Sequence, residues 1–140
     1  MIFALTRQEA EALFTRGKLA RLGCLADGEP YVVPVRYAVD GLTAVMHSLP
    51  GRKIDAMRAS PRVCLQIDEL RSEYHWRSVQ AFGAYEEITD NGEAERAADL
   101  LYARFPRLTP ADSVRRYGRG GEQPILFKIR IDRIVGVGEG

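Results

Sequence analysis

Two adjacent cations, Arg52 and Lys53, are the residues of this chain best placed for binding chemistry. They open a short helix predicted over 52–59, because Ile54 and Met57 are spaced to give it one apolar edge. Cations at a helix N-terminus are unfavourable by roughly 0.3 to 1 kcal/mol, since they face the positive end of the helix dipole. A bound dianion would reverse this repulsion, because both side chains and the free backbone N–H groups would attract it. The pair therefore predicts a phosphate site; the alternative is that both side chains simply point into solvent.

His47 and Ser48 precede that helix, at the expected end of a strand. Histidine changes its charge near neutral pH, so His47 could position a substrate or exchange a proton close to a bound ligand. The simpler alternative is that its imidazole hydrogen-bonds a phosphate or a backbone carbonyl. His47 is accordingly the candidate catalytic residue.

Two alternating segments lead up to these residues. Residues 31–39 place successive side chains on opposite faces of a strand, and residues 42–47 repeat the pattern. Between them, Asp40-Gly41 is typical of a tight hairpin in which both central residues have positive φ. We therefore expect the two strands to pair antiparallel. Ser60-Pro61 should end the helix, and a third strand should cover 63–68.

The rest of the chain adds hairpin strands and a few helices. Thr6 and Glu9 form a capping-box pattern for a helix ending near Gly17, and Asp90 with Glu93 signals a second long helix. Further strands are expected at 19–25, 77–88 and 125–131, with a bend or bulge at Gly83, and a short helix at 109–112. Without repeated strand–helix alternation or a G-x-G-x-x-G turn, a Rossmann fold is not expected. The expected fold is mainly β: an antiparallel closed or split barrel of about six strands with two or three helices.

Length and composition fit a single domain spanning residues 1–140. The chain has 46% hydrophobic residues and a formal net charge of +1, from 20 basic and 19 acidic side chains. No nucleic-acid partner is expected, because such a partner requires a basic face, and the exception is the cluster Arg107, Arg115, Arg116 and Arg119. No stretch reaches the roughly 18 apolar residues of a membrane helix, and the N-terminus lacks signal-peptide features. We therefore expect a soluble, cytoplasmic protein without membrane contact.

The two cysteines give no sign of metal or redox chemistry. Cys24 and Cys64 are isolated in sequence, and each alternates with apolar neighbours. A metal site or a redox disulfide would need further ligands or a paired thiol at suitable spacing. Both are expected to be small buried hydrophobic residues.

The order of these motifs resembles that of the pyridoxamine 5'-phosphate oxidase-related flavoproteins, which are FMN-binding split barrels. The shared order is strand, Asp-Gly hairpin, strand ending in His-Ser, Gly-Arg-Lys helix start, and the segments SPRVCLQID and WRSVQAFGAYEEI. The resemblance extends over roughly residues 5–137 and is strongest to the branch of nitroimidazole-resistance proteins. Each motif alone is weak, whereas their combined order is far more specific.

The resemblance implies FMN as the cofactor, bound at the interface of a homodimer. Family members hold the flavin phosphate with a basic pair that matches Arg52 and Lys53. Their flavin ring lies against the preceding hairpin, and the WRSV segment adds backbone and polar contacts. The matching positions here are Pro34, Val35, Arg36, Tyr37, His47, Ser48, Ser78 and Val79. Pro34 also fits physically, because a proline in a strand needs a position without a ladder N–H, such as an edge.

The implied function is an FMN-dependent oxidoreductase for a small molecule, with nitro-aromatic compounds as candidate substrates and a reduced nicotinamide as candidate donor. True pyridoxamine phosphate oxidases bind their substrate with a C-terminal Trp and an Arg/His pair. Here the last tryptophan is Trp76 and the last histidine is His75. Oxidation of pyridoxamine phosphate is therefore not expected. Both are expected in a loop, where Trp76 could stack on a flavin, contact a subunit or pack in the core. The alternatives are a non-catalytic flavin- or haem-binding storage or sensor protein, and an enzyme that uses a deazaflavin.

Overall fold

The computed structural model describes residues 1–106 and 124–140. One eight-stranded antiparallel sheet and three helices make up this part of the chain. The strands are β1 (Ile2–Ala4), β2 (Leu19–Ala26), β3 (Glu29–Arg36), β4 (Ala38–Asp40), β5 (Thr43–Ser48), β6 (Arg62–Ser72), β7 (His75–Glu87) and β8 (Ile125–Glu139). The helices are α1 (Arg7–Arg16), α2 (Arg52–Ala59) and α3 (Asn91–Arg104). The helix predicted at 109–112 and the arginine cluster Arg107, Arg115, Arg116 and Arg119 lie outside the described residues.

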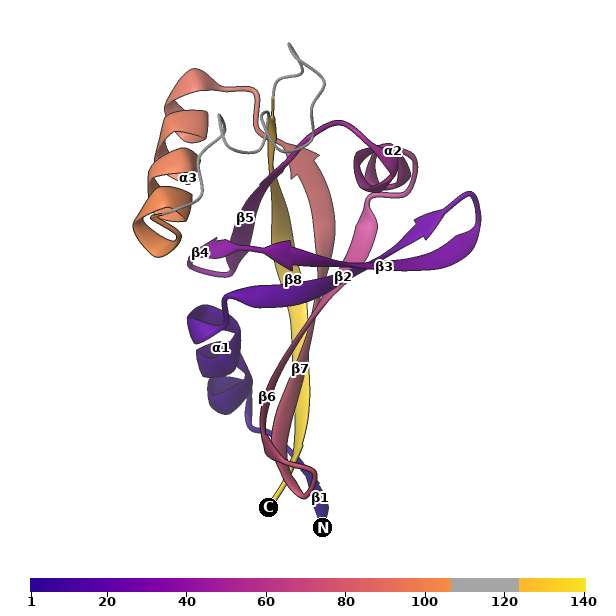
Figure 1. Cartoon of the computed structure of the whole chain (residues 1–140), viewed down its shortest axis with the longest axis vertical. Coiled ribbons are helices and arrows are strands. Elements are labelled where there is room, and N and C mark those ends of the chain that lie inside the picture. Colours follow the sequence, from indigo (N-terminus) through magenta and orange to yellow (C-terminus); the bar gives the residue numbers. More distant parts are fainter. Residues whose placement is uncertain (107–123) are drawn as a thin grey trace.

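The strands follow the order β3-β2-β6-β7-β8-β5-β4, with β1 added to the end of β8. In Figure 1, β6, β7 and β8 run along the long axis of the molecule, and both termini lie at its lower end. Helices α1 and α3 lie on the left of this view and α2 on the upper right. The predicted fold class, a mainly β split barrel with helices, is confirmed.

The expected strand 31–39 is divided in the structure, so that the barrel has more strands than predicted. The strand breaks at Tyr37, and β3 and β4, which are consecutive in the chain, lie at opposite edges of the sheet. Tyr37 is fully buried, stacks on Phe14 with 5.6 Å between ring centroids, and donates a hydrogen bond to the Phe14 carbonyl. The chain therefore passes from one sheet edge to the other at Tyr37, and this passage closes the barrel.

The predicted pairing of the two strands around Asp40-Gly41 is correct only for the last residues of the first strand. Residues 38–40 of β4 pair with β5, whereas β3 pairs with β2 across the turn at Asp27-Gly28. Of the turn residues Asp40 and Gly41, only Gly41 has a positive φ, so the expectation of two such residues is wrong there. Asp27 and Gly28 do both have positive φ, as this type of hairpin requires.

A bulge lies opposite Gly83, but its extra residue is on β8 and not on the long strand for which the sequence predicts a bend or bulge. The pairing of β7 with β8 shifts by one residue between Phe82 and Gly83, which leaves Asp132 as the extra residue. A Cβ at Gly83 would lie 2.1 Å from the Arg130 carbonyl oxygen, a distance that no side chain tolerates. The absence of a side chain at this position thus permits the close approach of β8.

The helices are fixed by capping and by their apolar residues. Thr6 and Glu9 form the predicted capping box of α1, and Asp90 caps α3. Phe14 from α1 and Ile54 and Met57 from α2 are fully buried in the main core. None of the helices in the described part of the chain is both long and apolar enough to span a membrane.

Candidate functional site: a cationic helix N-terminus beside a buried histidine

The N-terminus of α2 lies open for a ligand. Gly51 occupies the cap position with an extended backbone, and no side chain of residues 1–106 or 124–140 caps the helix by a hydrogen bond. Ile54 and Met57 pack into the main core, and α2 contacts β2, so the apolar edge predicted from sequence fixes the orientation of the helix. The first backbone N–H groups of a helix have no intrahelical partner and can bind an anion.

The two cations at this end of α2 lie beside different neighbours. The Arg52 guanidinium lies 4.9 Å from the centroid of the Tyr31 ring on β3. Lys53 is half-buried, and its burial lowers the pKa of the ammonium group, an effect that the nearby Cys24 thiol partly opposes. Within residues 1–106 and 124–140, no carboxylate forms an ion pair with either cation. Their charges are therefore not neutralised within this part of the molecule.

His47 lies close to Lys53, at the end of β5. Burial lowers the pKa of the imidazole, and the positive charge of Lys53 lowers it further. The imidazole is therefore neutral at pH 7. Its Nε2 atom is buried and has no hydrogen-bond partner among the described residues. Buried polar atoms are almost always satisfied, so an unpartnered one beside an open cationic helix end is consistent with a ligand-binding position.

These features fit a phosphate group. Two cations, free backbone donors and an imidazole offer several donors for a dianion, although α2 also has one acidic residue, Asp55, in its first turn. Ser48 follows His47, and its hydroxyl donates to the Leu49 carbonyl at 2.9 Å, so the hydroxyl oxygen remains able to accept. His47 thus lies close to Lys53, and Arg52 precedes Lys53 at the start of α2.

The predicted flavin positions on β3 fall on both faces of an edge strand. Pro34 and Arg36 are exposed, and the edge location expected for Pro34 is confirmed because, among the described strands, β3 pairs only with β2. The side chains of Val35 and Tyr37 point into the core, with exposures of 7% and 0%. Any contact of these two residues with a ligand would have to involve their backbone.

Ser78 and Val79 lie far from His47 within one chain. Ser78 pairs with Val137 of β8 and His47 pairs with Leu126, so eleven residues of β8 separate the two positions. At about 3.3 Å per residue this is roughly 35 Å along the strand. The Ser78 hydroxyl accepts a hydrogen bond from Gln66 at 2.9 Å, and Val79 is fully buried. Within one chain, Ser78 and Val79 therefore do not adjoin His47.

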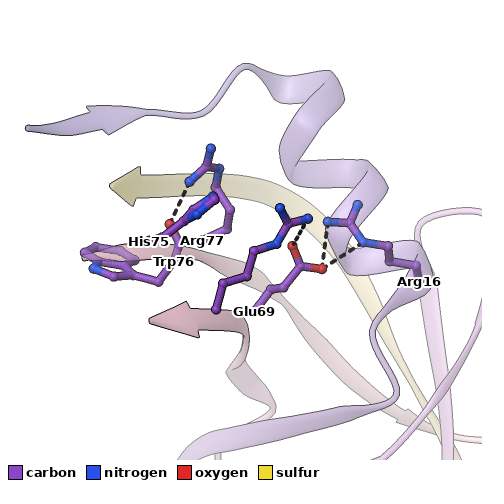
Figure 2. Close-up of a pocket in the computed structure, with 6 residues that line it drawn as sticks. Arg16, Glu69, His75, Trp76 and Arg77 are labelled. Atoms are coloured by element: carbon purple, nitrogen blue, oxygen red, sulfur yellow. Dashed lines mark hydrogen bonds and ion pairs between the residues drawn. The ribbon is translucent and has the colours of Figure 1, made fainter. Parts of the chain in front are cut away.

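A polar pocket of about 180 Å³ lies near the turn that joins the end of β6 to the start of β7. It is lined by Arg16, Glu69, Arg71, His75, Trp76 and Arg77, most of which Figure 2 labels. None of the residues predicted to bind flavin lines it. His75 and Trp76 begin β7, so their expected location in a loop is wrong; the ladder with β6 and β8 extends to Trp76.

Sequence analysis missed the neighbours of the two cations. Cys24 and Tyr31 are direct cross-strand partners in the β2–β3 hairpin, and they lie beside Lys53 and Arg52. The turn at Asp27-Gly28 indicates that Cys24 and Tyr31 are cross-strand partners, because a two-residue turn fixes the pairing of the strands it joins. What the turn does not reveal is the packing of α2 onto β2. Cys24 is buried as predicted, whereas Cys64 is only partly buried.

Comparison with known proteins agrees with the geometry of the fold. The sequence matches the family model described as pyridoxamine 5'-phosphate oxidase over residues 6–134. An uncharacterized protein of Rhizobium meliloti, RA0666, is 44% identical over 84 residues, and the chain spans only 56% of that relative's length.

Two solved structures have the same fold. An FAD-binding protein from Mesorhizobium loti superposes with a TM-score of 0.82 at 30% identity, over 100% of this chain and 99% of that one. A candidate 5-nitroimidazole antibiotic resistance protein from Bacteroides thetaiotaomicron superposes with a TM-score of 0.77 at 20% identity, over 99% and 87% of the two chains. With the barrel in place and the family model covering nearly its whole length, the chain belongs to the pyridoxamine 5'-phosphate oxidase family.

Proposed function

We propose that this protein is an FMN-dependent oxidoreductase that binds the flavin phosphate at the N-terminus of α2. The observation that carries the proposal is the pair Arg52 and Lys53, which no carboxylate neutralises within the described residues, at a helix end without a side-chain cap. Bound FMN would supply the electron-transfer chemistry, which no side chain provides. The chain's own residues would hold the phosphate and orient the ring.

His47 has the properties of a positioning or proton-exchanging group at this site. Its neutral imidazole has a buried Nε2 that a ligand could satisfy. A phosphate placed between His47 and Lys53 would also raise the imidazole pKa, because an anion offsets the charge of Lys53. His47 could then donate a proton at Nε2 to the ligand or to a substrate bound beside it.

The site would be completed by a second copy of the chain. Val32, Ser78, Val135 and Val137 share one sheet face by strand register, and the three valines are 64%, 44% and 44% exposed. We call this the open sheet face. Pairing two copies through it would cover the exposed valines and could bring Ser78 of one copy toward the α2 site of the other. This arrangement accounts for the distance between the two groups of predicted residues.

The first experiment is flavin binding by the purified protein. FMN is expected to remain bound after desalting, with the released flavin identified by chromatography as FMN rather than FAD. The double variant Arg52→Ala/Lys53→Ala should lose at least about 3 kcal/mol, roughly a hundredfold, of FMN affinity while binding riboflavin, which lacks the phosphate, as the wild type does. Arg58→Ala, at the other end of α2 and paired with Glu87, is the matched control. Unchanged FMN affinity in the folded double variant would remove the phosphate-site argument.

Turnover separates an enzyme from a simple binding protein. The FMN-loaded protein is expected to oxidise a reduced nicotinamide and to transfer the electrons to a nitro-aromatic compound, the acceptor class suggested by the structurally similar B. thetaiotaomicron protein. Retained flavin without turnover would favour the storage or sensor alternative. A haem spectrum in place of flavin bands would replace the cofactor assignment altogether.

A further inference from the structure

The polar pocket near the β6–β7 turn contains more positive than negative charge. Three of its six lining residues are arginines and only Glu69 is acidic. Arg16 Nη2 lies 3.2 Å from one oxygen of Glu69, and Arg71 Nη2 lies 3.9 Å from the other. Figure 2 shows Glu69 bonded to Arg16, with His75, Trp76 and Arg77 grouped beside them. One carboxylate is therefore shared by two guanidinium groups, and the third arginine adds a further positive charge.

Arg77 is held rigidly at this pocket. Its guanidinium donates to the carbonyls of Trp76 and Glu139, each at 2.9 Å, and to that of Gly140 at 3.4 Å. It also stacks on the ring of Phe3, 4.8 Å from the centroid. Three of the five N–H groups of an arginine are thus used by neutral carbonyls, which leaves the Nε–H and one Nη2–H available. A guanidinium fixed in this way loses little conformational entropy when it binds an anion.

The size of the pocket limits what it can hold. Its volume of about 180 Å³ is below the roughly 300–1,000 Å³ of pockets that enclose a whole organic ligand. It can therefore take a small charged group. The excess of two positive charges among the four charged lining residues matches a dianion, and arginine forks bind phosphate oxygens in pairs.

We propose that this pocket is an anion site for a phosphate or diphosphate group, separate from the flavin site. Arg71 and Arg77 bind the phosphate oxygens, and Arg16 adds a positive charge beside them that Glu69 partly neutralises. The pocket lies at the β6–β7 turn, whereas His47 lies beside the other end of β8. The proposal therefore does not depend on the flavin assignment.

Trp76 provides a direct measurement, because it lines the pocket and is the only tryptophan in the chain. We expect inorganic pyrophosphate, added at constant ionic strength, to change the Trp76 fluorescence saturably. Arg71→Gln should weaken this binding about fivefold to tenfold, because one charge-assisted contact is lost at an exposed position. Glu69→Gln should strengthen binding about threefold or more, since removal of the only acidic lining residue frees two guanidinium groups.

The matched control is Arg96→Gln on α3, an exposed arginine that lies outside the pocket. It should leave pyrophosphate affinity unchanged. Equal weakening by Arg96→Gln and Arg71→Gln would mean general surface electrostatics and would overturn the proposal, as would the absence of a saturable change in folded wild-type protein. The titration is repeated with FMN added, and equal pyrophosphate affinity in both samples is expected; failure to retain FMN would leave the pyrophosphate result intact.

Discussion

At the scale of single residues, the site depends on how the surroundings of Lys53 and His47 change their protonation. Burial lowers the pKa of both groups, and each positive charge makes a second one less favourable. The charge of Lys53 therefore disfavours the protonated form of His47. A phosphate bound beside them would relieve the repulsion and favour the protonated imidazole.

The variant His47→Gln tests the cost of protonating this histidine. Its pKa in the folded protein lies below the ordinary value of about 6.5, so the unfolded chain takes up the proton first as the pH falls. The contribution of His47 to stability is thus fully present above about pH 6.5 and is lost as the pH falls through its lowered folded-state pKa. We expect His47→Gln to lose less unfolding free energy than the wild type between pH 7 and pH 5, measured by urea denaturation. His75→Gln controls for the loss of a histidine, and identical pH profiles for His47→Gln and wild type would contradict the prediction.

A second residue-scale effect concerns Tyr37, where the chain crosses between the sheet edges. Its hydroxyl donates to the Phe14 carbonyl at the end of α1, and Arg104 from α3 lies 5.6 Å from its ring centroid while donating to the carbonyls of Thr15 and Gly17. Tyr37→Phe should lower the unfolding free energy by about 1 to 2 kcal/mol, because a buried carbonyl loses its partner. Tyr74→Phe, at a 71% exposed position, should have no measurable effect in the same urea titration. Equal stability of the two variants would show that the Tyr37 hydrogen bond contributes nothing.

At the scale of elements, the bulge of β7 and β8 sets the geometry of the long strands. The shift at Gly83 changes which β8 residues face the core, so β8 can pair with β5 on one side of the bulge and present Val135 and Val137 on the open sheet face on the other. A side chain at Gly83 would contact the Arg130 backbone at an impossible distance. The bulge therefore determines which β8 side chains lie in the core and which lie on the face proposed for the subunit contact.

Gly83→Ala should destabilise the protein by about 2 to 3 kcal/mol, because the new methyl group forces β7 and β8 apart. The matched control is Gly23→Ala, since a Cβ there meets nothing closer than the Cys64 carbonyl at 3.7 Å. Thermal unfolding of both variants measures the difference. A Gly83→Ala protein as stable as Gly23→Ala would mean that the strands adjust to the added atom at no cost.

At the scale of the whole molecule, the proposed function includes a second copy that covers the open sheet face. Helices α1 and α2 contribute to the core on the side of the buried strand residues, and the exposed valines lie on the other side. On this face Val32, Val135 and Val137 are exposed beside polar residues such as Arg21 and Gln80. The proposed dimer would place the Ser78 region of one chain near α2 of the other.

We expect the wild type to sediment as a dimer, and Val32→Asp and Val135→Asp to sediment as monomers with unchanged circular dichroism. Both variants should lose FMN, because each α2 site would lack the contribution of its partner. Ala103→Asp, at an exposed position on α3, should remain a dimer and retain FMN. A wild-type monomer that binds FMN fully would show that one chain is sufficient.

The local pattern of the sequence determined much of the fold. Alternating residues, the capping box at Thr6, the turn at Asp27-Gly28 and the glycine at position 83 specify their elements, because each depends on neighbouring residues alone. The apolar edge of α2 likewise specified the position of Arg52 and Lys53 at its N-terminus. These features are local, so the sequence contains them directly.

Only the tertiary structure decided how distant segments meet. The break at Tyr37 follows from barrel closure against α1 and α3, and the alternation of residues 31–39 gives no sign of it. Packing also placed Cys24 beside Lys53, left His47 Nε2 buried without a partner among the described residues, and put Ser78 eleven residues along β8 from His47. The pocket of Arg16, Arg71 and Arg77 likewise combines a helix end with two strands. Such contacts depend on the path of the whole chain, because burial and charge at each residue are set by segments far away in sequence.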